Sequence, residues 1–403
     1  MIERARVLSD TVFAPAAARF DRDRTYCWDN IPHLVDAGFM GMTIPKAYGG
    51  LGASFGDVVR IIEVIAGACT LTARVVVEAN MGGISAVMAY GSDAQKRLAA
   101  GLVLSGDKPA ICITEPDAGS AATEMRTTAQ RVSGGYCITG SKHWITGGGI
   151  SKLHFIFARV VNADGREEGI GGFLVACDPA NGVLPDGFRI VRHERTMGLC
   201  GMPEAELAFD GMFVGDDMVV CPPSGFRRGF ADLMNAYNGQ RVGAGTVALG
   251  IASGALKRAR NYLLEREQFG RPIAEFQGLQ WMLADMDASV HASRLMLREA
   301  AATAGLDGGR FPDKTAAARA KLFASEQAIR VVSDALQMFG ARGYGSDEPL
   351  ERMYRDVRMF TIGGGTAQVL RTQIAGSMLG IKTPQTREGV ARLDAVPMRE
   401  AAE

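Results

Sequence analysis

The chain changes its hydrophobic periodicity twice along its 403 residues, and the order of the three regions restricts the fold strongly. Residues 1–108 space their apolar side chains as helices do. Residues 109–221 carry short β-branched and aromatic runs separated by turn residues, which predicts an antiparallel β domain. From residue 222 the helical period returns, and we predict a helical bundle domain over 222–403. The expected fold is therefore α+β, because a doubly wound sheet needs strands and helices in alternation.

Individual elements follow from the same patterns. One N-terminal helix is expected over Asp57–Ala68, with Ser54 as its cap, and a second over Ile84–Leu104. The strands expected in the middle region are Ala110–Ile113, Tyr136–Thr139, Leu153–Val161 and Gly172–Val175. The long helices expected to form the bundle are Arg241–Leu264, Phe276–Ala301, Lys314–Phe339 and Thr366–Leu379.

Charge and cysteine content argue against several functional classes. Lys+Arg and Asp+Glu both number 44, and no polybasic block stands out, which argues against nucleic acid as a ligand. The seven cysteines are scattered and form no Cys-x-x-Cys pair, so we expect neither a metal site nor a disulfide framework. The N-terminal residues lack the apolar run of a signal peptide, and no segment reaches the roughly 18–20 apolar residues of a membrane span. We therefore expect a cytoplasmic protein that does not bind membranes.

Four segments carry groups suited to a polar, aromatic or phosphorylated ligand. The Thr114–Ser120 loop offers hydroxyls after a strand, and Trp144 with Thr146, on alternate strand positions, offers a stacking surface and a hydroxyl on one face. Arg266–Gln277 is a basic, aromatic connection suited to phosphate, and the glycines of Gln337–Tyr344 permit close backbone approach. Each segment alone fits an ordinary structural role better, as a strand-ending turn, a core tryptophan, a helix connection or a helix C-cap.

Taken together, in this order and with these separations, the segments closely resemble the acyl-CoA dehydrogenase superfamily. The resemblance runs from about Trp28 to about Pro384, and its most specific pieces are TEPDAGS, GSKHWITGG, REQFGRPIAEFQGLQWMLADM, QMFGARGYG and GGTAQVLR. It implies FAD as the cofactor and an acyl-CoA substrate. It also implies N-terminal helices, a middle β-barrel and a C-terminal four-helix bundle, assembled as a homotetramer.

The resemblance further implies roles for individual residues. Ser120 and Arg241 are expected to bind the acyl-CoA. The residues expected to bind FAD are Ile111, Ile113, Thr114, Trp144, Thr146, Gln337, Ala341, Thr366 and Gln368 and, toward the FAD of a neighbouring subunit, Arg266, Phe269 and Gln277. The chain departs from the family at Ala121, where aspartate is frequent, and at Ala341, where glycine is more frequent.

The residue that removes the substrate's α-proton in this family is missing from the sequence. Many members carry a glutamate at the position of Gly364, and others carry it at the position of Gln240, just before Arg241. Glutamine cannot take a proton at neutral pH, so neither position holds a base. A positioned base is worth on the order of 10²- to 10⁴-fold in rate. Either another carboxylate, such as Glu78, replaces it, or the reaction does not begin with α-proton removal.

Arg74 lies in an otherwise apolar stretch, residues 72–78. An arginine among valines either extends to the surface or faces a buried anion. Glutaryl-CoA dehydrogenases resemble this chain in having an arginine at or near this place, where it binds the distal carboxylate of the acyl group. The resemblance therefore implies an acyl-CoA with a distal anionic group.

An anionic acyl end together with a missing base resembles one branch of the family, the 3-sulfinopropanoyl-CoA desulfinases. That branch converts 3-sulfinopropanoyl-CoA and water to propanoyl-CoA and sulfite. The resemblance implies that Arg74 binds the sulfinate and that Gln240 orients the thioester or a water. FAD is then either structural or a transient acceptor of electron density.

Three other functions stay open at this point. The first is an FAD-dependent dehydrogenase of a short or dicarboxylic acyl-CoA that uses an unrecognised base. The second is a flavin monooxygenase of the same fold, and Ser120 and Arg241 on the CoA side argue against it. The third is a non-catalytic CoA-binding protein, and the charge of Arg74 among valines argues against it.

Overall fold

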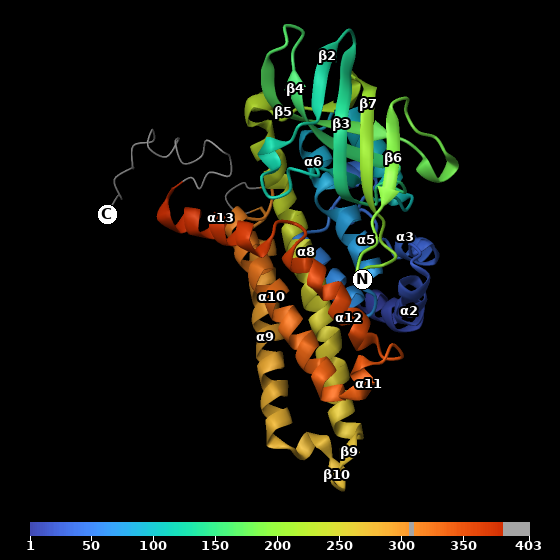
Figure 1. Cartoon of the computed structure of the whole chain (residues 1–403), viewed down its shortest axis with the longest axis vertical. Helices are drawn as coiled ribbons and strands as arrows, with labels where there is room; N and C mark the ends of the chain where they lie inside the picture. Colours follow the sequence, from blue (N-terminus) through green and yellow to red (C-terminus); the bar gives the residue numbers. More distant parts are fainter. Residues whose placement is uncertain (306–309, 382–403) are drawn as a thin grey trace.

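The structure, a computed structural model, describes residues 1–305 and 310–381. The part of the predicted bundle domain that follows residue 381 lies outside the described residues. N-terminal helices are followed by a sheet and then by long helices, which confirms the predicted α+β fold class (Figure 1). The N-terminal helices are α1 (Ile2–Leu8), α2 (Ala14–Asp23), α3 (Ile31–Asp36), α4 (Phe55–Ala66), α5 (Thr70–Asn80), α6 (Gly83–Tyr90) and α7 (Asp93–Leu104).

Helix capping explains one success and one error among the N-terminal predictions. The Ser54 side chain accepts a hydrogen bond from the Asp57 backbone N–H, so Ser54 is the predicted cap of α4. The prediction of a single helix over Ile84–Leu104 is wrong, because the segment is divided into α6 and α7. A capping box of Ser92 and Gln95 starts α7 afresh, and this local bonding outweighs the continuous apolar pattern.

The middle region forms one mixed sheet in the order β6-β7-β3-β2-β4-β5-β8, with β1 paired to β4. Most neighbours are antiparallel, as predicted, but β1 and β2 both pair with β4 in parallel. The strands are β1 (Ala110–Cys112), β2 (Thr128–Val132), β3 (Gly135–Thr146), β4 (Leu153–Val161), β5 (Glu167–Ala176), β6 (Phe188–His193), β7 (Glu204–Gly215) and β8 (Val219–Val220).

Long helices pack into the C-terminal bundle, which extends below the sheet in Figure 1. The first begins earlier than predicted, because its initial turns pack on β5, where Leu233 lies over Gly172. This tertiary contact extends the helix beyond the region of clear apolar periodicity. The main helices are α8 (Gly225–Glu265), α9 (Gln277–Ala302), α10 (Lys314–Phe339), α12 (Pro349–Val357) and α13 (Ala367–Leu379).

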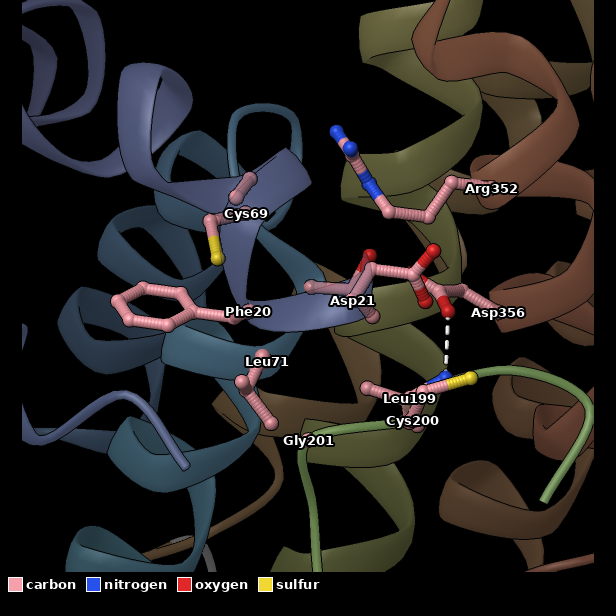
Figure 2. A pocket seen from close by; sticks show the side chains of 11 residues that line it. Phe20, Asp21, Cys69, Leu71, Leu199, Cys200, Gly201, Arg352 and Asp356 are labelled. Carbon is pink, nitrogen blue, oxygen red and sulfur yellow. Dashed lines mark hydrogen bonds between the residues drawn. The ribbon is translucent and has the colours of Figure 1, made fainter. Parts of the chain in front are cut away.

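An ion pair joins the N-terminal helices to the bundle beside a small cavity, whose lining includes Asp21 and Asp356 (Figure 2). Arg355 of α12 lies 2.6 Å from a carboxylate oxygen of Asp21 in α2 and 2.8 Å from one of Glu351. The next residue, Asp356, accepts a hydrogen bond of 2.6 Å from the Leu199 backbone N–H. Burial raises the pKa of Asp356 to about 6. These contacts fix α2 against α12.

No helix within residues 1–305 and 310–381 combines the length and the apolar content needed to span a membrane.

Close contact between α4 and α8 depends on glycine at position 250. A Cβ at Gly250 would lie 2.5 Å from the Ala66 Cβ and 2.5 Å from the Glu63 carbonyl oxygen. We expect Gly250→Ala to lower the free energy of unfolding by about 1–3 kcal/mol through overpacking, although alanine is the better helix former. Gly101→Ala, at an exposed position of α7 with nothing within 4 Å, should instead stabilise by about 0.5–1 kcal/mol. Urea unfolding of both variants measures these changes. Equal changes in the free energy of unfolding of the two variants would contradict the close contact at Gly250.

Candidate active site

Buried charged side chains gather where α5 packs on α8 and faces the sheet. Arg74 of α5 is only 8% exposed, and its Nη2 lies 3.0 Å from Oε1 of Glu78, one turn further along the helix. The other oxygen of Glu78 accepts a hydrogen bond from Nζ of Lys108, in the segment that precedes β1. One carboxylate therefore bridges two buried cations.

Of the two interpretations that the sequence offered for Arg74, the buried one is correct. Its anionic neighbour within the chain is Glu78, which was considered only as a replacement base. The helical spacing i,i+4 of residues 74 and 78 places them on one side of α5, and this signal was available once 70–80 was recognised as helix. The Nε of Arg74 is buried and has no hydrogen-bond partner among the described residues. The guanidinium therefore keeps donors for a ligand.

The Gly363–Gly365 segment, where the family's base would stand, lies against α8 and α10. A Cβ on Gly364 would lie 3.8 Å from the Ala244 Cβ and 3.9 Å from the Lys321 Cε. Nζ of Lys321 donates a hydrogen bond of 2.7 Å to the carbonyl of Gly365. Gly364 and Gly365 have φ of +73° and +97°, a region that side chains rarely adopt. The place of the missing base therefore adjoins a buried lysine.

Lys321 and Arg241 are cations that form no ion pair with any residue that the structure describes. Arg241 donates to the Asn238 side-chain oxygen at 2.8 Å, and its Nε is buried without a partner. Burial, followed by repulsion from Arg241 and Arg74, lowers the pKa of Lys321 to about 7. Burial also lowers the pKa of Arg241. An anion bound here would stabilise both charged side chains.

Gln240, the other place where the family carries its base, is buried on α8, and its Oε1 has no donor among the described residues. Gly82 lies beside it, since a Cβ there would stand 2.8 Å from this oxygen and 2.8 Å from Cδ1 of Ile111. A buried acceptor without a donor is costly to the fold. The Gln240 oxygen is therefore suited to accept a hydrogen bond from a ligand or a water.

A further carboxyl group, Glu204 of β7, was not predicted as a site residue. Both of its oxygens lie 2.9 Å from Oγ1 of Thr146, its cross-strand partner on β3. Burial raises the pKa of Glu204 to about 7, against the opposing effect of Arg74. The local sequence resembles an ordinary strand, and only the β3–β7 register would have revealed the pair.

The loop from Thr114 to Ser120 is held in place by Glu115. This carboxylate accepts hydrogen bonds from the backbone N–H groups of Arg126 and Thr127, at 2.6 and 3.0 Å, and from Lys142 Nζ at 2.8 Å. Burial alone would raise the pKa of Glu115, but Lys142 and the N–H groups outweigh it and lower the pKa. Glu115 therefore holds the loop and is not free to act elsewhere. The side chains at the two ends of the loop stay accessible, since Thr114 is half-buried and Ser120 is exposed.

Strand β3 carries a β-bulge at Trp144. Its register with β7 shifts between Lys142 and Ile145, so that two residues of β3 stand opposite one of β7, and Trp144 has a φ of +58°. The simple alternation predicted for Trp144 and Thr146 is therefore wrong. Trp144 is 52% exposed, which also excludes a core role, and it leaves a flat aromatic surface available to a ligand.

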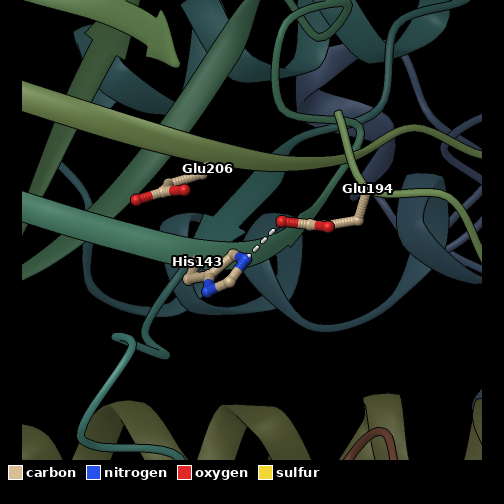
Figure 3. Close-up of side chains that lie close together, drawn as sticks. All are labelled: His143, Glu194 and Glu206. Carbon is tan, nitrogen blue, oxygen red and sulfur yellow. Dashed lines mark hydrogen bonds and ion pairs between the residues drawn. The ribbon is translucent and has the colours of Figure 1, made fainter. Parts of the chain in front are cut away.

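One face of the Trp144 ring packs on a polar network that begins with His143. The His143 ring stacks on the indole at 5.0 Å, and Nε2 of His143 lies 2.8 Å from an oxygen of Glu194 (Figure 3). Arg192 lies 2.7 Å from the same oxygen and 3.0 Å from Glu206. His143, Glu194 and Glu206 are close enough to share a metal ion, but Arg192 already forms ion pairs with both carboxylates. We interpret this network as a support for Trp144.

Comparison with known proteins identifies the family. The acyl-CoA dehydrogenase N-terminal domain matches residues 1–107, the middle domain matches 110–212 and the C-terminal domain matches 227–379. The chain belongs to the acyl-CoA dehydrogenase family. The 3-sulfinopropanoyl-CoA desulfinase of Variovorax paradoxus is 56% identical over 97% of this chain and 96% of its own length. A desulfinase of the same name from Cupriavidus necator is 55% identical over 96% of each chain.

A solved member of the acyl-CoA dehydrogenase family has the same fold. The glutaryl-CoA dehydrogenase complex with glutaryl-CoA matches this chain with a TM-score of 0.85 at 28% identity, over 96% of this chain and 95% of the other. The resemblance predicted from the sequence motifs is therefore confirmed at the level of the family.

In this member of the family the residues predicted to bind FAD do not all meet in one place within a single chain. Arg266 follows the end of α8, Phe269 lies in the hairpin of β9 (Glu267–Gln268) and β10 (Arg271–Pro272), and Gln277 begins α9. This hairpin lies at the opposite end of the long axis from the sheet that carries Trp144 (Figure 1). Phe269 is 92% exposed. Within one chain these three residues therefore do not reach Trp144.

Four of the other predicted FAD residues belong to the bundle, whereas Ile111, Ile113 and Thr114 lie in or just after β1. Gln337 near the end of α10 and Ala341 at the start of α11 (Ala341–Tyr344) are exposed. Thr366 caps α13, since its Oγ1 accepts from the Val369 N–H at 3.1 Å, and Gln368 is exposed on the first turn. These side chains are available to a ligand that approaches the bundle from outside.

The bridging role of Glu78 leads to a stability prediction. Glu78→Gln removes the carboxylate between Arg74 and Lys108 and leaves two buried cations without compensation. We expect it to lower the free energy of unfolding by about 3–5 kcal/mol. The control is Glu3→Gln, which breaks an exposed pair with Arg6 and should cost less than about 0.5 kcal/mol. Urea unfolding measures both, and a loss below 1 kcal/mol for Glu78→Gln would contradict the bridging role.

Proposed function

We propose that this chain is an FAD-containing desulfinase that converts 3-sulfinopropanoyl-CoA and water to propanoyl-CoA and sulfite. The observation that carries the proposal is that glycine and glutamine occupy positions 364 and 240, while the buried Lys321 lies beside Gly364 and Arg241 follows Gln240. The relatives from Variovorax paradoxus and Cupriavidus necator, which are named for this activity, support it. A site without an added carboxylate suits an anionic acyl group, because a carboxylate would repel it.

Arg74 would bind the sulfinate. A guanidinium carries five N–H donors, of which the contact with Glu78 uses only part, and its buried Nε has no other partner. Charge-assisted hydrogen bonds to an oxyanion are about twice as strong as neutral ones. Glu78 is shared with Lys108, so it would hold Arg74 in place without cancelling its charge. Gln240 would accept a hydrogen bond from a water or orient the thioester end, beside Ser120 and Arg241 on the CoA side.

The proposed reaction needs no α-proton removal. The C–S bond breaks with its electron pair left on Cβ, sulfur leaves as SO₂, and Cβ takes one proton. Water then adds to SO₂, which gives hydrogen sulfite and returns one proton. Atoms and charge balance without an external oxidant or reductant. A base at position 364 would therefore have no step to perform.

FAD fits the residues present. The exposed indole of Trp144 offers a flat surface for an aromatic ring system, and Thr146 lies on the same strand. Thr366 and Gln368 would hold the adenine half of the cofactor. Gln337 and Ala341, at the α10–α11 junction toward the hairpin end of the bundle, would contact the pyrophosphate of an FAD bound by a neighbouring subunit. When bound, FAD would supply a ring able to accept electron density or to shape the pocket.

The exposed hairpin residues Arg266 and Phe269, with Gln277, would serve the FAD of a neighbouring subunit in a homotetramer. An arginine at a surface turn suits the pyrophosphate, because its planar group binds phosphate oxygens in pairs. Phe269, at 92% exposure in the single chain, would be covered by that neighbour.

The deciding experiment adds 3-sulfinopropanoyl-CoA anaerobically to the purified flavoprotein and follows sulfite and flavin absorbance together. A desulfinase releases sulfite while the flavin stays oxidised. Glutaryl-CoA and butanoyl-CoA serve as comparison substrates. Bleaching of the flavin by either one without sulfite release from the first substrate would replace the proposal with a dehydrogenase of a short or dicarboxylic acyl-CoA.

The role of Arg74 predicts a selective loss of activity. Arg74→Ala removes the anion-binding group while Lys108 still neutralises Glu78, so the fold should persist. We expect kcat/KM for sulfite release to fall by roughly 30- to several thousand-fold, as for the loss of a buried charge partner worth about 2–5 kcal/mol. Arg74→Lys should recover only part of this, because lysine lacks the paired donors.

Two controls separate binding of the anion from general damage. Affinity for butanoyl-CoA, whose acyl end is uncharged, should change much less than affinity for the sulfinate substrate. Arg97→Ala, at an exposed arginine of α7, should keep its activity. Full sulfite release by Arg74→Ala at both limiting and saturating substrate would show that another group binds the sulfinate.

A further inference from the structure

Glu204 is a carboxyl group of the site that has no role in the proposed function so far. It stands directly across from Thr146 in the β3–β7 pairing, and the Gly147 N–H donates to the Pro203 carbonyl at 2.7 Å beside it. Backbone pairing therefore fixes the two side chains against each other. The pair adjoins the bulge that presents Trp144, at the end of β3.

The geometry of this contact favours a protonated carboxyl group. Both oxygens of Glu204 lie 2.9 Å from the single Oγ1 of Thr146. A hydroxyl has one hydrogen to donate and two lone pairs to accept with. Two equally short contacts are best satisfied when one carboxyl oxygen accepts the threonine hydrogen and the other carries a proton and donates it back. A carboxylate could use only the first contact fully.

The charges around Glu204 are consistent with a proton held near neutral pH. Arg74 and Glu78 face it from α5, Lys108 from the segment before β1, and Tyr237 from α8. Burial is the largest influence and raises the pKa, as does Glu78, whereas Arg74, Thr146 and Lys108 lower it. The net result is a pKa of about 7. The acid form is therefore present below about pH 7 and is lost as the pH rises through this value.

We propose that Glu204 stores the proton that Cβ takes when the sulfinate leaves, and that it passes this proton through the hydroxyl of Thr146. This inference rests on the proposed function, because Cβ is one bond from the sulfur that Arg74 would bind. The Arg74–Glu78–Lys108 bridge reaches Thr146, whose carbonyl oxygen lies 3.4 Å from Lys108 Nζ. The Thr146 hydroxyl gives its hydrogen to Cβ and receives the Glu204 proton. The Glu204 carboxylate then regains the proton released when water adds to SO₂. Each turnover leaves Glu204 as it began.

Lys321 is the competing proton source, because its pKa is also lowered to about 7. Its Nζ, however, is directed at the Gly365 carbonyl at 2.7 Å, on the α10 side of the site. A cation that donates to a backbone carbonyl is well placed to hold the glycine segment. Glu204 has instead a direct hydrogen-bonded neighbour with an exchangeable proton.

The test compares Glu204→Gln with wild type in the FAD-loaded enzyme, with 3-sulfinopropanoyl-CoA as substrate. Glutamine keeps the size and can bond to Thr146 but stores no proton. We expect kcat for sulfite release to fall by about 10²- to 10⁴-fold with KM and FAD content little changed. Wild-type kcat should fall as pH rises through about 7, and the residual activity of the variant should lack this pH dependence.

The control is Glu168→Gln, at an exposed carboxylate of β5 outside the site. It should keep kcat and the wild-type pH profile. Wild-type kcat in Glu204→Gln, or the wild-type pH dependence retained in that variant, would overturn the proposal and favour Lys321. Should Glu204→Gln fail to fold, the wild-type profile decides, since a kcat that is constant from pH 6 to 9 also overturns it. Absence of sulfite from the wild-type enzyme would instead refute the desulfinase function itself.

Discussion

The Glu78 carboxylate, buried between Arg74 and Lys108, is the interaction on which the rest of the site depends. Arg74 belongs to α5, whereas Lys108 belongs to the segment that leads into β1, so this carboxylate ties the N-terminal helices to the sheet. Burying three charges is costly unless each has a partner, and here each of them does. The positions of Ile111 on β1 and of Arg74 are thereby fixed relative to one another.

Positive charge exceeds negative charge in the neighbourhood of this bridge. Arg241 and Lys321 approach it from α8 and α10, and the acidic groups nearby are Glu204 and Asp107. Two opposite pKa changes follow from one environment, because burial lowers the pKa of Lys321 and raises that of Glu204, both toward about 7. The protein thus accepts an electrostatic cost that a bound anion would relieve, which is expected of a binding site more than of a structural core.

Sequence patterns predicted those parts of the fold that are set by local periodicity. The bounds of Lys314–Phe339 and Leu153–Val161 are correct, because both segments have the full apolar spacing of their type. The failures come from interactions that periodicity does not contain. A capping box divided one predicted helix at Ser92, and a bulge displaced Trp144 from regular alternation. Family motifs pointed to Gly364, but the adjacent Lys321 lies more than forty positions away and is brought there only by folding.

The left-handed backbone at Gly364 bears on how such a chain can change over evolution. With φ at +73°, any side chain at this position would be strained by roughly 1–2 kcal/mol. A single mutation to glutamate would meet that strain and would also bring the new carboxylate beside Lys321, where an ion pair would reduce its basicity. A proton-abstracting glutamate at this position therefore requires the loop and its lysine to change together. The conformation of one glycine thus opposes the gain of a base by a single substitution.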